Sequence, residues 1–137
     1  MQKLNKRLAR SESLGKYDII IRPIVGPEAI TGSTRMKAGT ATKLILNMLT
    51  TTTMIKIGKV YENLMVDLRA TNVKLTDRAE RIIMTVTGVS QDNAKELLES
   101  AFGNAKVAIV MQKLRIDYTE AKKRLDVQGG FVRKVLE

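Results

Sequence analysis

Apolar and polar residues recur along this chain at spacings that predict mostly helices. Residues 1–16 are polar, with only a weak helical pattern. The run Ile19–Ile21 is β-branched and apolar, and it predicts one short buried strand of a parallel sheet. An unpaired apolar strand is unstable, so this strand would have to pair with a second copy, fold back or stay disordered.

The longest predicted helix runs from about Thr34 to Gly58. One stripe at helical spacing comprises Ala41, Leu44, Ile45, Met48, Leu49, Thr52 and Ile55. Leu46 and Ile57 lie off this stripe, so the helix is apolar over much of its girth and is expected to be buried. Its partner would be another subunit or a further domain. We expect self-association, at least as a dimer, because large exposed apolar patches seldom stay unpaired.

The rest of the chain divides into a connecting segment and a helical bundle. Residues 59–75 predict a short helix or turn followed by a linker, and residues 76–137 predict short helices joined by short loops. Expected helix starts are Thr76-Asp77, Ser90, Asn104 and Asp117, and expected stops are Gly88, Gly103 and Gly129-Gly130. The three helices expected in residues 76–114 resemble a ubiquitin-associated-type bundle in their lengths and loops, from which ubiquitin binding does not follow.

Composition narrows the chemistry. The chain has 137 residues, of which 44% are apolar, and it contains neither Cys nor His. Disulfides and thiolate metal sites are therefore excluded, and so are the usual general base and the commonest metal ligand. We expect no metal and no cofactor. No signal peptide or membrane-spanning run is apparent, so a cytoplasmic location is expected.

The formal net charge of +10 suggests an anionic partner. Its Lys and Arg residues are spread along the chain, and no aromatic residue is interleaved with the local basic run Lys3–Arg10. A base-stacking surface is not indicated, and nucleic acid is not the expected partner. A phosphorylated ligand or simple solvation explains the charge equally well.

The main candidate site is the segment from Gly26 to Lys43, GPEAITGSTRMKAGTATK, at the head of the long predicted helix. Its glycines and proline predict a loop. Ser33 and Thr34 can cap the helix, and Arg35 adds a guanidinium beside its free N–H groups. Such an arrangement can hold a phosphate or carboxylate. The alternative is an ordinary capped helix start with solvated charges.

Two segments carry a family resemblance. The sequence GPEAITGSTRMKAGTATKLILNML, followed by GKVYENLMVDLRATNVKLTDRA, closely resembles the N-acetylmuramic acid 6-phosphate etherase family. The related glucokinase regulatory protein shares much of the pattern, and both belong to the sugar isomerase (SIS) group of phosphosugar-binding folds. Family members are considerably longer. The resemblance therefore implies a mainly α C-terminal portion, with residues 1–58 as the remnant of an α/β SIS domain.

The resemblance also implies an activity. The family is a group of lyases in cell-wall recycling that cleave the lactyl ether to N-acetylglucosamine 6-phosphate and D-lactate. Its catalytic glutamates are implied to lie upstream of this chain, so no catalytic residue is assigned and the chain alone is expected to be inactive. Two alternatives are a non-catalytic module that senses a sugar phosphate and a helical protein-interaction domain.

Substrate-binding roles follow from the same resemblance. The loop would contribute Ser33, Thr34 and Arg35, and the Asn-x-Lys-Leu signature would place Asn72 and Lys74 in a lid over a phosphorylated amino sugar. Without the resemblance, Asn72 is a turn residue and Lys74 a surface lysine. Glu28 either lines the sugar site or caps the helix by accepting from backbone amides, and the sequence leaves this open.

Overall fold

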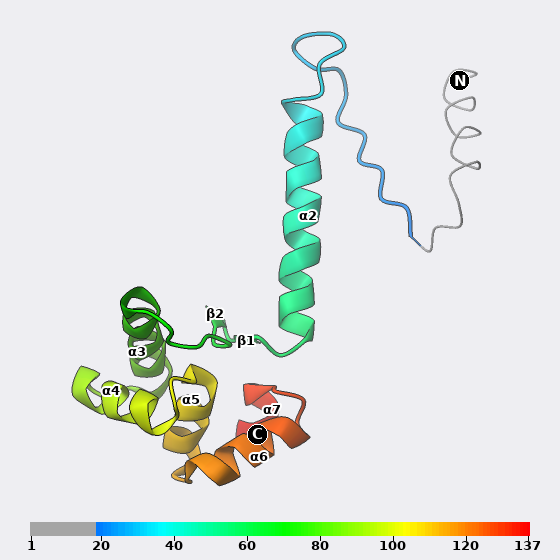
Figure 1. The fold of residues 1–137 in the computed structure, drawn as a ribbon. Coiled ribbons are helices and arrows are strands. Elements are labelled where there is room, and N and C mark those ends of the chain that lie inside the picture. Colours follow the sequence, from blue (N-terminus) through cyan, green and yellow to red (C-terminus); the bar gives the residue numbers. More distant parts are fainter. Residues whose placement is uncertain (1–18) are drawn as a thin grey trace. The chain divides into compact units, whose positions relative to one another are not determined.

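A computed structural model describes residues 19–137, so the weak helical pattern in residues 1–16 lies outside the described part. Within that part the fold is mainly helical, with six helices and one two-stranded sheet (Figure 1). The chain divides into two compact units, one ending at Ile45 and the other spanning Leu46–Glu137. Each unit is described by itself.

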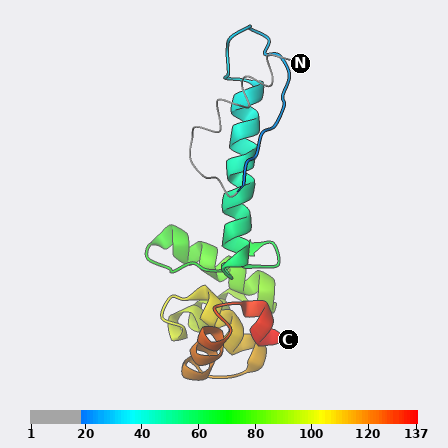
Figure 2. The same ribbon diagram turned by 90° about the vertical axis from the view of Figure 1, so that its right-hand side faces the viewer.

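The long helix is α2, Lys37–Lys56, which confirms the prediction with slightly shorter ends (Figure 2). Its threonines satisfy their hydroxyls within the helix: the Oγ1 atoms of Thr50 and Thr53 donate to the carbonyls of Leu46 and Leu49 at 2.9 and 2.8 Å. No residue of α2 is buried within the single chain, so burial of the helix against another subunit or a further domain stays a prediction. None of the described helices is long and apolar enough to cross a membrane.

The strand predicted at Ile19–Ile21 does not form. These residues have no strand pairing, and they are 80%, 57% and 54% exposed. The physical reason is that a strand is defined by its hydrogen-bonded neighbour, and no described segment of this chain supplies one.

The segment after α2 forms a β-hairpin where a short helix or turn was expected. Strands β1, Val60–Tyr61, and β2, Leu64–Met65, pair antiparallel, with Val60 opposite Met65 and Tyr61 opposite Leu64. Glu62 occupies the two-residue turn with a φ of 52°. The apolar spacing misled the prediction because residues three and four apart also occur on the two arms of a tight hairpin.

Five helices form the predicted bundle. They are α3, Val73–Thr87; α4, Gln91–Ser100; α5, Ala105–Leu114; α6, Tyr118–Val127; and α7, Val132–Leu136. The predicted caps at Ser90, Asn104 and Asp117 are confirmed, since each side chain accepts from the backbone N–H three residues later. The left-handed Gly88 closes α3 as expected.

Helix α5 is the centre of the bundle. It contacts α3, α4, α6 and α7, and Ala105–Val110 are all buried. The largest fully buried side chains are Ile83, Ile109, Val66, Val110 and Val132. Leu, Ile, Val and Ala thus form the core.

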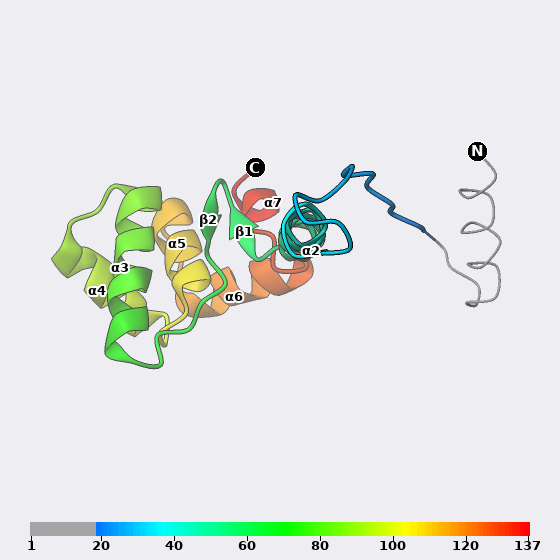
Figure 3. The same cartoon turned by 90° about the horizontal axis from the view of Figure 1, so that it is seen from above.

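A buried lysine fixes the hairpin to the bundle. Lys106 of α5 is only 8% exposed, and its Nζ donates to the Gly58 carbonyl at 3.0 Å and lies 2.9 Å from Asp67 Oδ1. Lys59 Nζ lies 3.1 Å from the other carboxylate oxygen of Asp67. Arg133 of α7 pairs with Glu62 in the hairpin turn at 2.8 Å. These ion pairs place the hairpin beside α5 and α7 (Figure 3).

Candidate functional site

Glu28 caps the start of α2 from nine residues upstream. Its carboxylate accepts from the backbone N–H groups of Lys37 and Ala38 at 3.1 and 3.0 Å. These hydrogen bonds, led by the one from Ala38, lower the pKa of Glu28, while desolvation opposes them. A carboxylate at a helix N-terminus is also favoured by the helix dipole. Of the two roles that the sequence left open for Glu28, the structure shows the capping one.

The sequence suggested Ser33 or Thr34 as the cap of this helix. The structure instead shows Glu28 in that role. Ser33 lies in a turn, with its N–H donating to the Ile30 carbonyl at 3.0 Å, and its Oγ accepts from the Arg35 N–H at 3.4 Å. These residues form a compact loop before the helix without capping its first turn. Glu28 can cap both amides because each of its two carboxylate oxygens accepts from one of them.

The predicted phosphate-binding groups remain at the surface of this loop. The side chains of Thr34 and Arg35 are exposed, and that of Ser33 is half-buried. Since Glu28 occupies the Lys37 and Ala38 amides, an anion arriving here would meet hydroxyls and a guanidinium before it met the helix N-terminus. Glu28, Ser33, Thr34 and Arg35 all belong to the unit that ends at Ile45.

Asn72 and Lys74 lie at the start of α3, in the second compact unit. Asn72 is the N-cap: its Oδ1 accepts from the Leu75 N–H at 2.9 Å. The helix thus begins one turn earlier than the Thr76-Asp77 start that the sequence predicted. Lys74 is exposed in the first turn, where its ammonium is free to meet a ligand in solvent. The Asn72 Oδ1 accepts in the cap, and its amide N–H₂ group is left to donate to a ligand.

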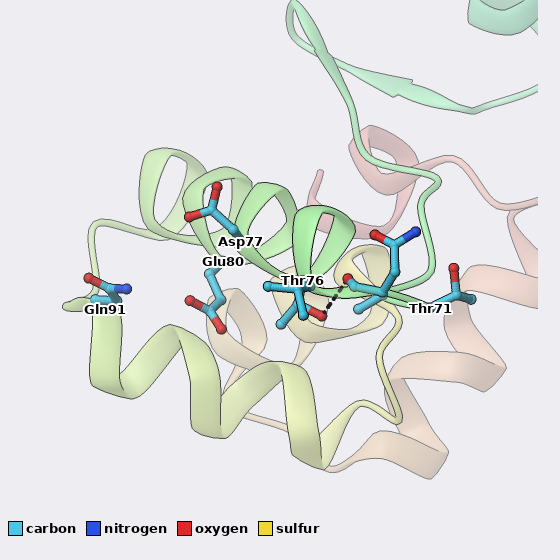
Figure 4. A pocket seen from close by; sticks show the side chains of 8 residues that line it. Thr71, Thr76, Asp77, Glu80 and Gln91 are labelled. Atoms are coloured by element: carbon cyan, nitrogen blue, oxygen red, sulfur yellow. Dashed lines mark hydrogen bonds between the residues drawn. The ribbon is translucent and has the colours of Figure 1, made fainter.

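An open pocket of about 540 Å³ lies beside Asn72, between the first turns of α3 and the start of α4 (Figure 4). Its lining residues are Ala70, Thr71, Asn72, Val73, Thr76, Asp77, Glu80 and Gln91. Lys74 is not among them. Glu80 was missed by sequence reasoning, because a glutamate within a helix carries no local signal that tertiary packing will bury it.

The described residues contain no group of three or more metal-ligating side chains. In the loop before α2, the carboxylate of Glu28 is engaged with two backbone amides. The geometry of the loop and of the start of α3 therefore suits binding by hydroxyl, amide and cationic groups. No described residue is assigned to acid or base catalysis.

Comparison with known proteins gives two kinds of match. Residues 62–117 match a family described as the C-terminal lid domain of glucokinase regulatory protein. That stretch begins in the hairpin turn and ends at Asp117, the cap of α6. It includes Asn72, Lys74 and the whole pocket.

Curated relatives cover most of the chain. The N-acetylmuramic acid 6-phosphate etherase of Alkaliphilus metalliredigens is 55% identical over 120 residues, which are 88% of this chain and 39% of the relative. The enzyme of the same name from Salinibacter ruber is 53% identical over 88% of this chain and 39% of its own length. That of a Geobacillus species is 52% identical over 93% of this chain and 44% of its own length.

The chain spans about two-fifths of the length of these relatives. The resemblance predicted from its motifs is thus confirmed: over most of its length, this chain is related in sequence to the N-acetylmuramic acid 6-phosphate etherases.

Proposed function

We propose that this chain supplies phosphosugar-binding loop and lid residues to an N-acetylmuramic acid 6-phosphate etherase. The observation that carries the proposal is the identity of 55% with such an etherase over 88% of the chain. The expected reaction cleaves the lactyl ether to N-acetylglucosamine 6-phosphate and D-lactate. Such an elimination needs a base for the proton beside the sugar's carbonyl carbon and an acid for the leaving oxygen. Neither role is assigned to a residue of this chain.

The loop would bind the phosphate through its exposed groups. Arg35 offers a guanidinium, whose planar fork suits phosphate oxygens, and Ser33 and Thr34 offer hydroxyls. Glu28 has a supporting role in this proposal: by capping α2 it fixes the loop that carries the three ligand groups.

The start of α3 would contribute the lid contacts. Lys74 is an exposed point charge suited to a phosphate, and the Asn72 N–H₂ group can donate to a sugar oxygen. The two groups lie two residues apart on a capped first turn, so the N-cap of α3 fixes them both.

A thermal-shift comparison tests this binding. We expect N-acetylglucosamine 6-phosphate to raise the midpoint of thermal unfolding, because a ligand that binds only the folded chain stabilises it. Unphosphorylated N-acetylglucosamine should leave the midpoint unchanged. The variants Arg35→Ala and Lys74→Ala should each reduce the response, while Lys95→Ala, which removes an exposed lysine of α4, should retain it.

Equal responses to both sugars, or a response that Arg35→Ala and Lys74→Ala leave intact, would contradict the proposed phosphate contacts. A non-catalytic sugar-phosphate sensor is the second candidate, because the matched lid domain is named for a regulatory protein. It would give the same thermal shift. Response to neither sugar would favour a helical protein-interaction domain instead.

A further inference from the structure

The pocket beside Asn72 contains a nearly buried carboxylate without a partner. Glu80 is 8% exposed, and no hydrogen bond or ion pair joins its side chain to any described residue. No buried side-chain oxygen of the described residues is sealed off without a partner, so the Glu80 carboxylate meets the open space of the pocket that it lines. Figure 4 shows Glu80 extending from α3 toward α4. The carboxylate is therefore a charge that faces the pocket without a protein partner, and it is available to a cationic group.

Glu80 is not needed to cap a neighbouring helix. The nearest helix start is that of α4, whose first residue, Gln91, also lines the pocket. Helix α4 already has its cap, because Ser90 Oγ accepts from the Asn93 N–H. The N-terminus of α3 is likewise capped by Asn72. The carboxylate is therefore available to a molecule entering the pocket.

The hydrogen-bonding state of the lining makes it rich in acceptors. The Thr76 hydroxyl donates its proton to the Asn72 carbonyl at 3.1 Å, so toward the pocket Thr76 Oγ1 can only accept (Figure 4). Glu80, when ionised, is also an acceptor only. Gln91 can turn its amide oxygen inward as a further acceptor.

The charged residues that line the pocket, Asp77 and Glu80, are both acidic. Asp77 is held by Arg81, at 3.2 Å from its Nε and 3.0 Å from its Nη2. Arg81 does not line the pocket, and none of the lining residues is Lys or Arg. Glu80 is thus an uncompensated negative charge within a chain of formal net charge +10. An anionic ligand is disfavoured here by repulsion.

We propose that this pocket binds a primary ammonium group. An ammonium carries three N–H donors, no acceptor and one positive charge, and it matches an acceptor-lined pocket around one carboxylate. Glu80 would form the ion pair, and Thr76 and Gln91 would accept the other two protons. The proposed phosphate contacts of Arg35 and Lys74 lie outside this pocket, whereas Asn72 lines it and also has a proposed sugar contact.

Titration followed by ¹H–¹⁵N NMR tests the site on the whole chain. Ethanolamine and Nα-acetyl-lysinamide are the probes, one a free amine and the other a peptide-borne lysine side chain. Ethylene glycol is the matched neutral control, because it has a hydroxyl where ethanolamine has the ammonium. We expect saturable shifts at the amides of residues 71–80 and 91 with either amine, and none with ethylene glycol.

Two charge-neutralising variants sharpen the test. Glu80→Gln should weaken amine binding about tenfold, the usual effect of losing a charge-assisted hydrogen bond. Glu99→Gln removes one exposed carboxylate of α4 outside the pocket and should leave binding unchanged. Saturable binding of ethanolamine alone would mean that the site takes only small amines. Saturable binding of both probes would mean that it also takes a lysine side chain.

Equal shifts with ethylene glycol, or no saturable shift with either amine, would overturn the proposal. So would equal weakening by Glu80→Gln and Glu99→Gln. The comparison of ethanolamine with ethylene glycol on the unmodified chain decides the matter even if Glu80→Gln fails to fold.

Discussion

Glu28 accepts hydrogen bonds from two backbone amides at the start of α2. Its ionisation is therefore coupled to the folding of this helix end. The hydrogen bonds from Ala38 and Lys37 lower the folded-state pKa from the ordinary value of 4.5. A lowered pKa means that the contribution to stability is fully present above 4.5 and is lost as pH falls through the folded-state value. The start of α2 should therefore loosen in acid.

The first prediction concerns this carboxylate. In a ¹³C NMR titration, the Glu28 carboxyl should have its midpoint below 4.5. Glu28→Gln should increase the hydrogen-exchange rates of the first amides of α2 at neutral pH, with little effect on α5. A midpoint at or above the ordinary value would show that the cap does not persist in solution.

Lys106 and Asp67 illustrate a second kind of residue, one buried for structural reasons. Partial burial opposes ionisation of Asp67, but hydrogen bonds from Lys106 and Lys59 outweigh it and lower the pKa. The more buried of the two lysines also bonds the Gly58 carbonyl. Its loss would leave both Asp67 and that carbonyl without a donor from α5.

We accordingly expect Lys106→Met to lower the free energy of unfolding by about 1–3 kcal/mol at neutral pH. Lys59→Met, the matched control with a partly exposed ion pair, should cost no more than about 1 kcal/mol. Urea unfolding measures both. Because the Asp67 pKa is lowered, the Lys106→Met effect should shrink as pH falls below the ordinary value of 3.8. Equal costs for the two lysines would contradict the tethering role.

At the scale of elements, Gly58 follows α2 and lies in close contact with Gly130 and Phe131. Its φ is 72°, and a Cβ placed there would lie 3.1 Å from the Phe131 ring and 3.2 Å from the Gly130 carbonyl carbon. Gly88, which closes α3, has a similar φ of 77° but nothing within 4 Å of such a Cβ. A side chain would cause backbone strain at both glycines, but steric overlap only at Gly58. Comparing the two positions therefore separates the two effects.

Gly88→Ala should cost about 1–2 kcal/mol of unfolding free energy, the strain of a left-handed residue with a side chain. Gly58→Ala should cost clearly more, because the same strain is joined by overlap with Phe131 and Gly130. Denaturant unfolding of both variants under one condition gives the comparison. A smaller cost at Gly58 would contradict this prediction, because it would mean that Phe131 and Gly130 move aside easily.

The exposed apolar surface of α2 is a further property of an element. Leu44 and Met48 are 55% and 60% exposed, and no residue of the helix is buried. We propose that a second copy covers this surface, since patches of this kind seldom stay unpaired. Sedimentation velocity should show a species larger than the monomer. Leu44→Gln with Met48→Gln should shift it to the monomer without lowering helicity, and a monomer in both proteins would reject this interface.

Local signals predicted much of the fold. The caps at Ser90, Asn104 and Asp117 were found because a capping side chain acts only three residues away. The start of α3 was placed late because Asn72 and Thr76-Asp77 are all good capping residues, and the sequence does not say which one acts. The strand at Ile19–Ile21 failed because strands depend on distant partners.

The candidate site was predictable to the same extent. Residues 33–35 form a loop before α2 as predicted, whereas α3 begins one turn before the predicted start. Glu28 as the cap, Glu80 in its pocket and the buried Lys106 all depend on contacts across long sequence separations or on tertiary burial. Composition alone treats each of them as an ordinary surface charge.

For the molecule as a whole, the account predicts binding without turnover by this chain alone. The relatives are more than twice as long, and no described residue is assigned as acid or base. Incubation with N-acetylmuramic acid 6-phosphate should release no D-lactate above background in an enzymatic lactate assay. Sustained release at a rate proportional to chain concentration would show that the chain contains its own acid and base.

The most direct test of the central claim is a ¹H–¹⁵N NMR titration with N-acetylglucosamine 6-phosphate. We predict saturable shifts at the loop residues 33–35 and at residues 72–74, and no such shifts with N-acetylglucosamine. Shifts confined to other residues, or identical shifts with the unphosphorylated sugar, would contradict it.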